Sequence, residues 1–309
     1  MIPIYVSSIG YELGERVSLA ALPQSADETQ LTDLRGSGME HYRESTDSVG
    51  TLSMRSVETT LAAWTGDVQT IDCIIFCSMS LPELDDESLA NLCTTANLPK
   101  IPVVGISLNG CAHLAPALRF ARGLIASEGL RNILVITADK CMTPERRVAD
   151  MNFAVLSDGA ASCIVSSSLE SAEFRVDGIG QASNNRLRGI DYSQSQRRTM
   201  GMISVGVRES ARLALAEACM PEGSASCAIM SNVRNDACQM FAKQCKLSPM
   251  SVYSESLSDV GHCFSSDPLI NLAKSGDWRR AKATDNDEKR FLVFGLGPFA
   301  WGALLFMPV

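Results

Sequence analysis

The chemistry that this sequence offers starts at Cys111, which follows a β-branched apolar run and the dipeptide Asn109-Gly110. Apolar residues at helical spacing come after it, so the stretch 103–125 predicts a strand, a tight turn and a helix, with Cys111 in the first turn of the helix. Unpaired backbone N–H groups at a helix start carry partial positive charge, which favours the thiolate. Cys111 is therefore a candidate nucleophile, although buried cysteines are more often inert.

The other cysteines indicate the redox state of the protein. There are 11 in total, an odd number, and most lie in apolar runs. This pattern favours reduced thiols in a cytoplasmic protein over a disulfide framework. The chain has no Cys-x-x-Cys pair and only three histidines, His41, His113 and His262, so we expect no metal site.

Size and composition narrow the class of protein. The 309 residues are 46% hydrophobic and 20% charged, as in a globular chain of two domains or one large α/β unit. The formal charge is −8 and no basic run stands out, which argues against nucleic-acid binding. Residues 1–9 lack the basic flank of a signal peptide, and no apolar stretch is long enough for a membrane span. We expect a cytoplasmic protein without a membrane or nucleic-acid partner.

Strands and helices alternate along the chain, which indicates an α/β fold with mostly parallel sheets covered on both faces. In the first half we expect strands at 4–9, 71–80, 103–107, 131–140 and within 153–167, helices at 50–64, 88–98 and after Cys111, and a long polar loop at 23–50. In the second half we expect helices at 208–219, 235–247 and 260–276, and strands at 226–232 and on both sides of a glycine loop within 290–309.

The two halves follow the same plan. The strand at 71 leads to strands at 131 and 160, and the strand at 226 leads to strands at 290 and 301 in the same way. We infer an internal duplication of about 150 residues, with an N-terminal domain at 1–170 and a C-terminal domain at 171–309. The turns at Cys111 and His262 then occupy related positions in the two halves.

Five stretches of the sequence, in this order, resemble the thiolase-like condensing enzymes, most closely β-ketoacyl-ACP synthase III. They are NGCAHLAPALRFARGLIASEGLRNILVITADK, SDGAASCIV, IMSNVRNDACQMFAKQCKLS, VGHCFSSDPLINL and VFGLGPFAWGALLF. The resemblance implies an α-β-α-β-α layered fold built from two duplicated halves. It places Cys111 on the acyl-accepting cysteine, and Gly297 on the glycine whose N–H completes an oxyanion hole with the N–H of the nucleophile. The alternative for Gly297 is a simple turn between two strands.

Two positions depart from the synthase pattern. The synthases have a His in a His-Gln-Ala-Asn motif, where this chain has Ser231-Asn232-Val233-Arg234. They have an Asn in a Gly-Asn-Thr-Ser loop, where this chain has His262. In the synthases this pair stabilises the enolate that forms as carbon dioxide leaves. Because Ser231 and His262 are not that pair, the resemblance points away from carbon–carbon condensation.

An acid, Asp267, stands five residues after His262. An imidazole suits the deprotonation of a thiol and then of an acceptor, and it needs a partner on its other nitrogen. The set Cys111, His262 and Asp267 resembles acyltransferases of polyketide and antibiotic biosynthesis, which use a Cys (or Ser)–His–Asp triad. Asp267 precedes Pro268, so helix capping is the alternative. Ser231 is a further catalytic candidate, through a hydrogen bond to His262 or substrate, with space filling as the alternative.

Four residues are candidates for substrate binding. His113 stands two residues after the nucleophile and either points into the site or covers the helix. Phe153 and Leu156 are candidates to line an acyl tunnel. Arg234 is a candidate to meet the phosphate of a carrier, with a solvated surface as its alternative.

The acyl donor is left open between coenzyme A and an acyl carrier protein. The synthases clamp the adenine of coenzyme A with a Trp and an Arg, but the matching stretch 31–45 contains Arg35 and Arg43 and no Trp. A carrier protein is therefore the stronger candidate. Either donor delivers the acyl group on a phosphopantetheine arm, so we expect no bound cofactor. The resemblance also implies a homodimer, with a heterodimer as the alternative.

Three hypotheses follow for the function. The first is an acyltransferase of secondary metabolism, which forms an acyl-enzyme at Cys111 and passes the acyl group to a small-molecule acceptor without decarboxylation. The second is a condensing enzyme of the synthase III type. The third is a non-catalytic subunit of a heterodimeric ketosynthase, although the presence of Cys111, His262 and Gly297 together argues against it.

Overall fold

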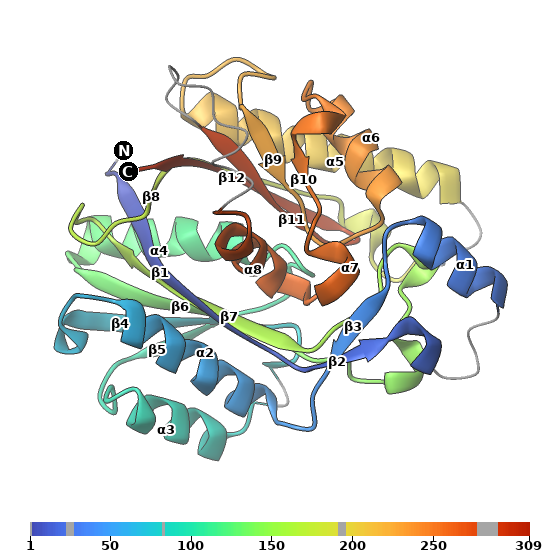
Figure 1. Cartoon of the computed structure of the whole chain (residues 1–309). Helices are drawn as coiled ribbons and strands as arrows, with labels where there is room; N and C mark the ends of the chain where they lie inside the picture. The colour runs from blue at the N-terminus through green and yellow to red at the C-terminus, as the bar shows by residue number, and fades with distance from the viewer. Residues whose placement is uncertain (1, 23–27, 82–83, 191–195, 277–289) are drawn as a thin grey trace.

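The computed structural model describes residues 2–22, 28–81, 84–190, 196–276 and 290–309. Their strands form a ten-stranded sheet, in the order β10-β9-β11-β12-β8-β1-β7-β6-β4-β5, and a two-stranded ribbon of β2 and β3. The termini lie close together beside β1 and β8 (Figure 1). In the part of the chain described, no helix has both the length and the hydropathy needed to span a bilayer.

The first half of the chain supplies five neighbouring strands of the large sheet. The elements of this half are β1 (Ile4–Leu13), β2 (Glu15–Ser18), α1 (Glu28–Gly36), β3 (His41–Glu44), α2 (Val49–Ala63), β4 (Ile71–Cys77), α3 (Asp86–Thr95), β5 (Val103–Ile106), α4 (Leu114–Glu128), β6 (Asn132–Asp139) and β7 (Gly159–Ser166). β4 pairs in parallel with β5 and β6, whereas β7 is antiparallel to β6 and β1. Of the five strands that this half contributes to the large sheet, all except β7 therefore run in the same direction.

The second half repeats this arrangement strand for strand. Its elements are β8 (Phe174–Ser183), α5 (Gln196–Glu217), β9 (Cys227–Ile229), α6 (Asn235–Gln244), β10 (Val252–Tyr253), α7 (Leu257–Val260), α8 (Asp267–Lys274), β11 (Phe291–Leu296) and β12 (Ala300–Pro308). β9 pairs in parallel with β10 and β11, and β12 is antiparallel to β11 and β8. β1 and β8 pair antiparallel and join the halves. The predicted boundary at 170/171 falls in the connection between β7 and β8.

The helices form three layers around the two halves of the sheet. In Figure 1, α2 and α3 cover the outer face of the first half, α5 and α6 cover the outer face of the second, and α4 and α8 lie between them. The predicted α-β-α-β-α class is therefore the class observed. Because α4 and α8 share the central layer, the turns that precede them come close together.

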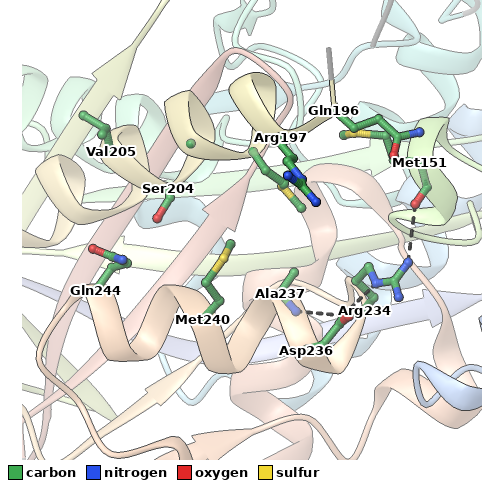
Figure 2. Close-up of a pocket in the computed structure, with 12 residues that line it drawn as sticks. Met151, Gln196, Arg197, Ser204, Val205, Arg234, Asp236, Ala237, Met240 and Gln244 are labelled. Atoms are coloured by element: carbon green, nitrogen blue, oxygen red, sulfur yellow. Dashed lines mark hydrogen bonds and ion pairs between the residues drawn. The ribbon is translucent and has the colours of Figure 1, made fainter. Parts of the chain in front are cut away.

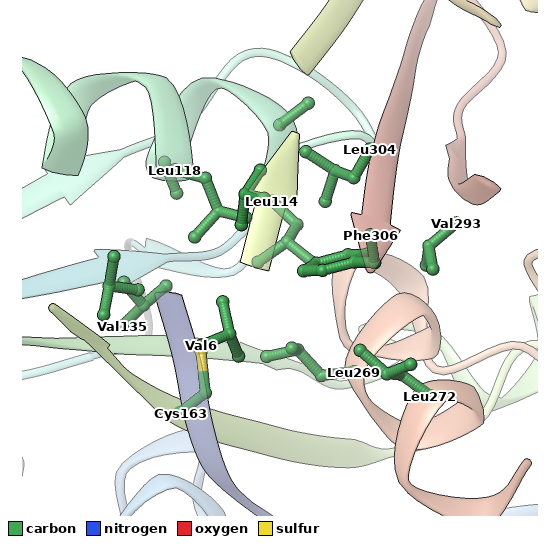
Figure 3. Close-up of a cluster of buried hydrophobic side chains, with 14 of the residues drawn as sticks. Val6, Leu114, Leu118, Val135, Cys163, Leu269, Leu272, Val293, Leu304 and Phe306 are labelled. Atoms are coloured by element: carbon green, nitrogen blue, oxygen red, sulfur yellow. The ribbon is translucent and has the colours of Figure 1, made fainter. Parts of the chain in front are cut away.

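Apolar side chains on the two central helices hold this layer in place. Figure 3 shows Leu114 and Leu118 of α4, with Leu269 and Leu272 of α8, packed among side chains such as Phe306 from the strands on either side. All five are nearly or fully buried. Burial of each such side chain contributes about 1.5–3 kcal/mol, so the helices that carry the site are fixed from both faces.

The polar stretch 23–50, expected to be one long loop, contains regular structure. Outside residues 23–27, which are not described, it includes α1, β3 and the start of α2. Leu34, Met39 and Tyr42 are buried in a small apolar cluster that also includes Val155 of the first half and Leu257 of the second. The prediction was wrong here because a few apolar residues, widely spaced among polar ones, are enough to seat a short helix and strand.

The sequence prediction also missed β8 and placed the start of α5 twelve residues too late. β8 contains glycines, which weaken a strand pattern. At Gly180, a Cβ would lie 1.8 Å from the carbonyl oxygen of Ser210 on α5. Glycine is therefore required at this position because helix and strand backbones are in direct contact, a reason that only the packed structure reveals.

Candidate active site

Cys111 lies in the turn between β5 and α4, three residues before the helix begins. The prediction that it is in the first helical turn was wrong by this distance. Leu108 and Gly110 both have positive φ, at 71° and 56°, and they bend the chain just ahead of the thiol. Cys111 is 6% exposed, and among the described residues its N–H has no hydrogen-bond acceptor. The turn therefore presents a nearly buried thiol next to a free backbone donor.

The structure brings Cys111, His262 and Asp267 into one line. The Nε2 atom of His262 lies 3.2 Å from the Cys111 Sγ, and its Nδ1 atom lies 2.5 Å from Oδ2 of Asp267. His262 is 4% exposed and Asp267 is fully buried. This is the geometry of a nucleophile, a base and an acid that orients the base.

The Asp267 carboxylate accepts hydrogen bonds from three groups. Oδ2 accepts from His262 and from the backbone N–H of Asn232 at 2.7 Å, and Oδ1 accepts from the N–H of Cys263 at 2.7 Å. Asp267 is the first residue of α8, and none of these donors belongs to that helix. The alternative of a helix cap alone therefore does not describe its contacts.

The backbone of His262 is held by a segment of the first half. Its N–H donates to the Val155 carbonyl at 2.8 Å, and its own carbonyl accepts from the N–H of Ser157 at 2.9 Å. Gly261 has a φ of 67°, and a Cβ there would lie 2.4 Å from the Ser157 Oγ. Leu156, predicted to line a tunnel, lies in this bridge and pairs with His262 through the backbone. The base is thus positioned by both halves of the molecule.

The surroundings of His262 favour its charged form. Burial by itself lowers the pKa of this imidazole, but the charges of Asp267 and Cys111 and the hydrogen bonds to both outweigh burial. The net effect raises the pKa of His262 well above its usual value. The imidazolium form of His262 is therefore favoured next to the Cys111 sulfur.

Asn232 is a residue that sequence reasoning missed. Besides its N–H bond to Asp267, its side-chain amide donates to the Gly261 carbonyl at 2.7 Å and accepts from Asn271 at 2.8 Å. It thus holds both the acid and the residue before His262. Its position next to Ser231 was the only signal in the sequence, because a backbone donor leaves no trace in residue type.

Ser231 does not contact His262 in the way that was predicted. Its hydroxyl donates to the Phe294 carbonyl at 3.1 Å and accepts from the N–H of Leu296 at 3.1 Å. Both partners belong to the end of β11. The structure therefore shows Ser231 as a brace between the end of β11 and the segment that follows β9, and not in the predicted hydrogen bond to His262. The predicted contact with a substrate stays a prediction.

Gly297 lies beside Cys111, but its N–H is engaged elsewhere. This N–H donates to the Ala300 carbonyl at 3.0 Å and closes the hairpin between β11 and β12. A Cβ on Gly297 would lie 3.0 Å from the Cys111 nitrogen. Gly297 is a residue of the hairpin turn, and its lack of a side chain keeps the space next to the Cys111 N–H open. Its own N–H is not the free second donor that was predicted.

His113 is buried beneath the nucleophile turn. Its Nε2 accepts from the Asn109 N–H at 3.3 Å, and its Nδ1 has no partner among the described residues. Burial lowers the pKa of His113 to about 4. The neutral ring must therefore carry its proton on Nδ1. The bond from the Asn109 N–H to Nε2 supports the turn that contains Cys111, which agrees with the alternative in which His113 covers the helix.

Arg234 is held by ion pairs within the chain. It pairs with Asp33 at 3.3 Å and with Asp236 at 2.6 Å, and its guanidinium also donates to the Met151 carbonyl at 3.4 Å. Figure 2 shows it at one end of a cavity of about 620 Å³, which lies between α5 and α6. Neither Cys111 nor His262 lines this cavity. Arg234 is thus neutralised and lies apart from the triad.

Phe153 also packs away from the triad. Its ring meets that of Phe241 on α6 edge to face, with 6.3 Å between the centroids. It belongs to the apolar cluster between α5, α6 and the second half of the sheet.

Over the same described residues, no group of three or more His, Cys, Asp and Glu side chains is arranged to hold a metal ion. The ten cysteines other than Cys111 are reduced thiols, and all except Cys219 are buried. Burial raises the pKa of several of them, including Cys73, Cys93 and Cys141. These thiols are the poorer nucleophiles.

Comparison with known proteins places this geometry in context. Residues 107–183, which include Cys111, match the family model of 3-oxoacyl-[acyl-carrier-protein] synthase III. A search of curated proteins found no match.

Solved structures of similar fold cover almost the whole chain. The 3-oxoacyl-[acyl-carrier-protein] synthase III of Aquifex aeolicus superposes with a TM-score of 0.81 at 17% identity, over 98% of this chain and 99% of that one. ChlB3, described as an acyltransferase, gives 0.82 at 16% identity, over 99% and 98%. The priming β-ketosynthase of the R1128 polyketide pathway gives 0.78 at 16% identity, over 98% and 96%. The chain therefore has the thiolase-like fold of these proteins, as predicted.

Proposed function

We propose that this protein is an acyltransferase that uses Cys111 as its nucleophile. The observation that carries the proposal is the line from Cys111 through His262 to Asp267, with 3.2 Å between sulfur and imidazole. The Cys111 thiolate attacks the carbonyl carbon of an acyl thioester, and a tetrahedral intermediate forms. The carbon–sulfur bond to the donor then breaks, and His262 gives its proton to the departing thiolate. The products are acyl-Cys111 and a free donor thiol.

The second half of the reaction regenerates the enzyme. His262, now neutral, takes the proton of an acceptor hydroxyl, amine or other nucleophile as it attacks the acyl-cysteine. The bond to sulfur breaks, the acyl group leaves on the acceptor, and the thiolate–imidazolium pair returns. Asp267 supports the imidazolium and fixes the Nδ1 proton throughout. The Cys111 N–H is the proposed oxyanion donor, because it has no other acceptor among the described residues.

A condensing enzyme is the second candidate, favoured by the match of residues 107–183 to the synthase III model. Two features favour transfer without condensation. Ser231 stands where the synthases have a histidine, so this position supplies no second imidazole. Its hydroxyl is bonded to the β11 backbone. His262, the residue in line with Cys111, is ion-paired to Asp267 and favours its charged form. That arrangement supports proton transfer to and from sulfur.

The donor, the partners and the setting are further parts of the proposal. The donor is an acyl group on the phosphopantetheine of a carrier protein or of coenzyme A, with no cofactor retained. The acceptor is a small molecule of a secondary-metabolite pathway, and the active form is a homodimer in the cytoplasm. The resemblance to synthase III supports the donor and the homodimer, the names of the structural neighbours support a carrier protein and a polyketide-related pathway, and the pattern of reduced cysteines supports the cytoplasm.

The test is acylation followed by intact-protein mass spectrometry. Wild type incubated with acetyl, butyryl and malonyl thioesters of N-acetylcysteamine gains one acyl mass, and C111A gains none. H262A acylates about 10²–10⁴-fold more slowly. H41Q is the matched control, because His41 is bonded to Arg16 and to the Ser258 carbonyl, outside the triad.

Two outcomes oppose the proposal. If wild type gains no acyl mass, or if C111A gains it equally, Cys111 is not an acyl acceptor. If the malonyl thioester releases carbon dioxide and a β-keto product forms, the protein is a condensing enzyme.

A further inference from the structure

Met79 covers the sulfur of Cys111. Its Sδ lies 4.0 Å from the Cys111 Sγ, in van der Waals contact. Met79 follows the end of β4 and is 44% exposed, whereas Cys111 is 6% exposed. One end of the methionine is therefore in solvent while its thioether is on the nucleophile. An acyl group bound to Cys111 has to share this space with the Met79 side chain.

The backbone of Met79 is held by a buried carboxylate, Asp139, at the end of β6. Oδ1 of Asp139 accepts from the Met79 N–H at 2.6 Å, from the Ser78 hydroxyl at 3.0 Å and from the Ser80 N–H at 3.2 Å. Asp139 is fully buried, and burial raises its pKa despite these bonds. Three consecutive residues are thus fixed on one oxygen, so only the Met79 side chain has freedom to move.

The other oxygen of Asp139 reaches the segment that carries the triad. Its Oδ2 accepts from the Ser265 hydroxyl at 2.7 Å. Ser265 lies in the short 3-10 helix Phe264–Ser266, between His262 and Asp267. One carboxyl group therefore connects the segment that covers Cys111 to the segment that positions its base.

We propose that Met79 determines which acyl groups Cys111 accepts, and that Asp139 is the residue that positions it. Methionine is flexible and fills irregular space, so its thioether can turn aside for a short acyl group. A longer chain needs more room than one rotating side chain on a fixed backbone provides. The class of substrate is therefore short, unbranched acyl thioesters. This inference rests on the acyl-enzyme of the proposed function.

The first test compares acyl chain lengths. Rates of acylation with acetyl, butyryl, hexanoyl and octanoyl thioesters of N-acetylcysteamine are measured for wild type, M79A and M79S. We expect wild type to prefer acetyl, and both variants to raise the ratio of hexanoyl to acetyl rates at least about tenfold, as for a pocket that gains room for a methylene or more. M79L keeps the volume and keeps the wild-type ratio. M250A is the matched control, because Met250 is exposed in the 3-10 helix ahead of β10, outside the triad. An unchanged ratio in M79A and M79S overturns the proposal.

The second test does not depend on acyl transfer. Iodoacetamide and N-hexyl iodoacetamide alkylate any accessible thiolate, and peptide mass spectrometry reports the reaction at Cys111 alone. M79A raises the relative rate of the hexyl reagent at Cys111 and leaves the ratio at exposed Cys219 unchanged. If wild type is not acylated by any thioester but M79A still changes this ratio, the proposed function fails and the Met79 assignment stands. If the ratio does not change, the assignment fails by itself.

The third test addresses Asp139. In D139A the N–H of Met79 and the hydroxyl of Ser265 both lose their acceptor, so the backbone that carries Met79 is no longer held by this side chain. We expect the hexanoyl to acetyl ratio to move in the same direction as in M79A, by a smaller factor. A loss of stability with no change in this ratio contradicts the positioning role, because a purely structural carboxylate does not alter selectivity among chain lengths.

Discussion

His113 and His262 are both buried close to the same thiol, one in each half of a duplicated fold, yet their surroundings affect them in opposite ways. His262 has the Asp267 carboxylate at 2.5 Å, and its pKa is raised well above the usual value. His113 has a backbone N–H on one nitrogen and no partner on the other among the described residues, and burial lowers its pKa to about 4. The comparison shows that the charges and hydrogen bonds of Asp267 and Cys111 together outweigh burial at His262, whereas burial acts without such partners at His113.

The two turns that carry these residues differ in the same sense. The turn before α4 presents a thiol and is supported by a neutral imidazole. The turn before α8 carries a histidine and an acid, with three donors around the acid. The strand order of the two halves is the same, so the difference in chemistry comes from these short connections. Three substitutions, from the largest expected effect to the smallest, test this contrast through acyl transfer and through stability.

The largest effect is expected for D267N. Without the carboxylate charge, the pKa of His262 falls toward that of a buried, unpaired histidine such as His113. The charged form of His262 is no longer favoured, and we expect acylation of Cys111 to slow by about 10²-fold or more, within the range of general acid–base contributions. Acylation rates of the two proteins between pH 5 and 9 check this, because a lower pKa of His262 shifts the pH profile of the variant. D259N is the control, since Asp259 pairs with Arg43 away from the thiol. Superimposable pH profiles would contradict the assignment.

The second prediction concerns the stability that depends on His113. Its folded pKa of about 4 is below the value of about 6.5 for an unfolded histidine, so the unfolded chain binds the extra proton first. The contribution to stability is present above pH 6.5 and is lost as the pH falls toward 4, by about 3 kcal/mol. Urea unfolding at pH 7, 6 and 5 should show a shallower pH dependence for H113Q than for wild type. Parallel curves for the two proteins would mean that His113 is already protonated or solvated.

The smallest effect on transfer is expected for S231A. The Leu296 N–H loses its acceptor, and a buried unsatisfied donor costs about 1–3 kcal/mol of folding free energy. The transfer rate of the folded protein should be nearly unchanged, because Ser231 touches β11 and not His262. Thermal unfolding and acylation rates are measured together, with S251A as the control, because Ser251 is half-buried and bonded only to the local Ser248 carbonyl. A large loss of rate without loss of stability would place Ser231 in the chemistry after all.

The sequence predicted most of the fold because its signals are local. Buried strands such as 71–77 and 132–139 are continuous apolar runs, and the repeated order of strands in the two halves is visible in the spacing. The exceptions have physical causes. β8 is interrupted by glycines where α5 approaches its backbone, and α1 rests on a few apolar residues in a polar stretch. Such features depend on contacts with distant elements.

The sequence identified Cys111, His262 and Asp267 as candidates from residue type, order and spacing. It did not distinguish capping from orientation for Asp267, or a residue that points into the site from one that covers the helix for His113. Asn232, Met79 and Asp139 were missed because they act through backbone groups or through contacts across 32 to 126 positions in the chain.

What the sequence by itself determined is the layered α/β class, the repeated order of strands in the two halves and the candidate residues Cys111, His262 and Asp267. Hydrophobic periodicity and residue chemistry are enough for those conclusions. Only the tertiary structure decided that His262 lies 3.2 Å from Cys111, that the Gly297 N–H is bonded to Ala300, and that Met79 covers the thiol. The physical reason is that α4 and α8 share one buried layer, so the turns before them meet although they are 151 residues apart.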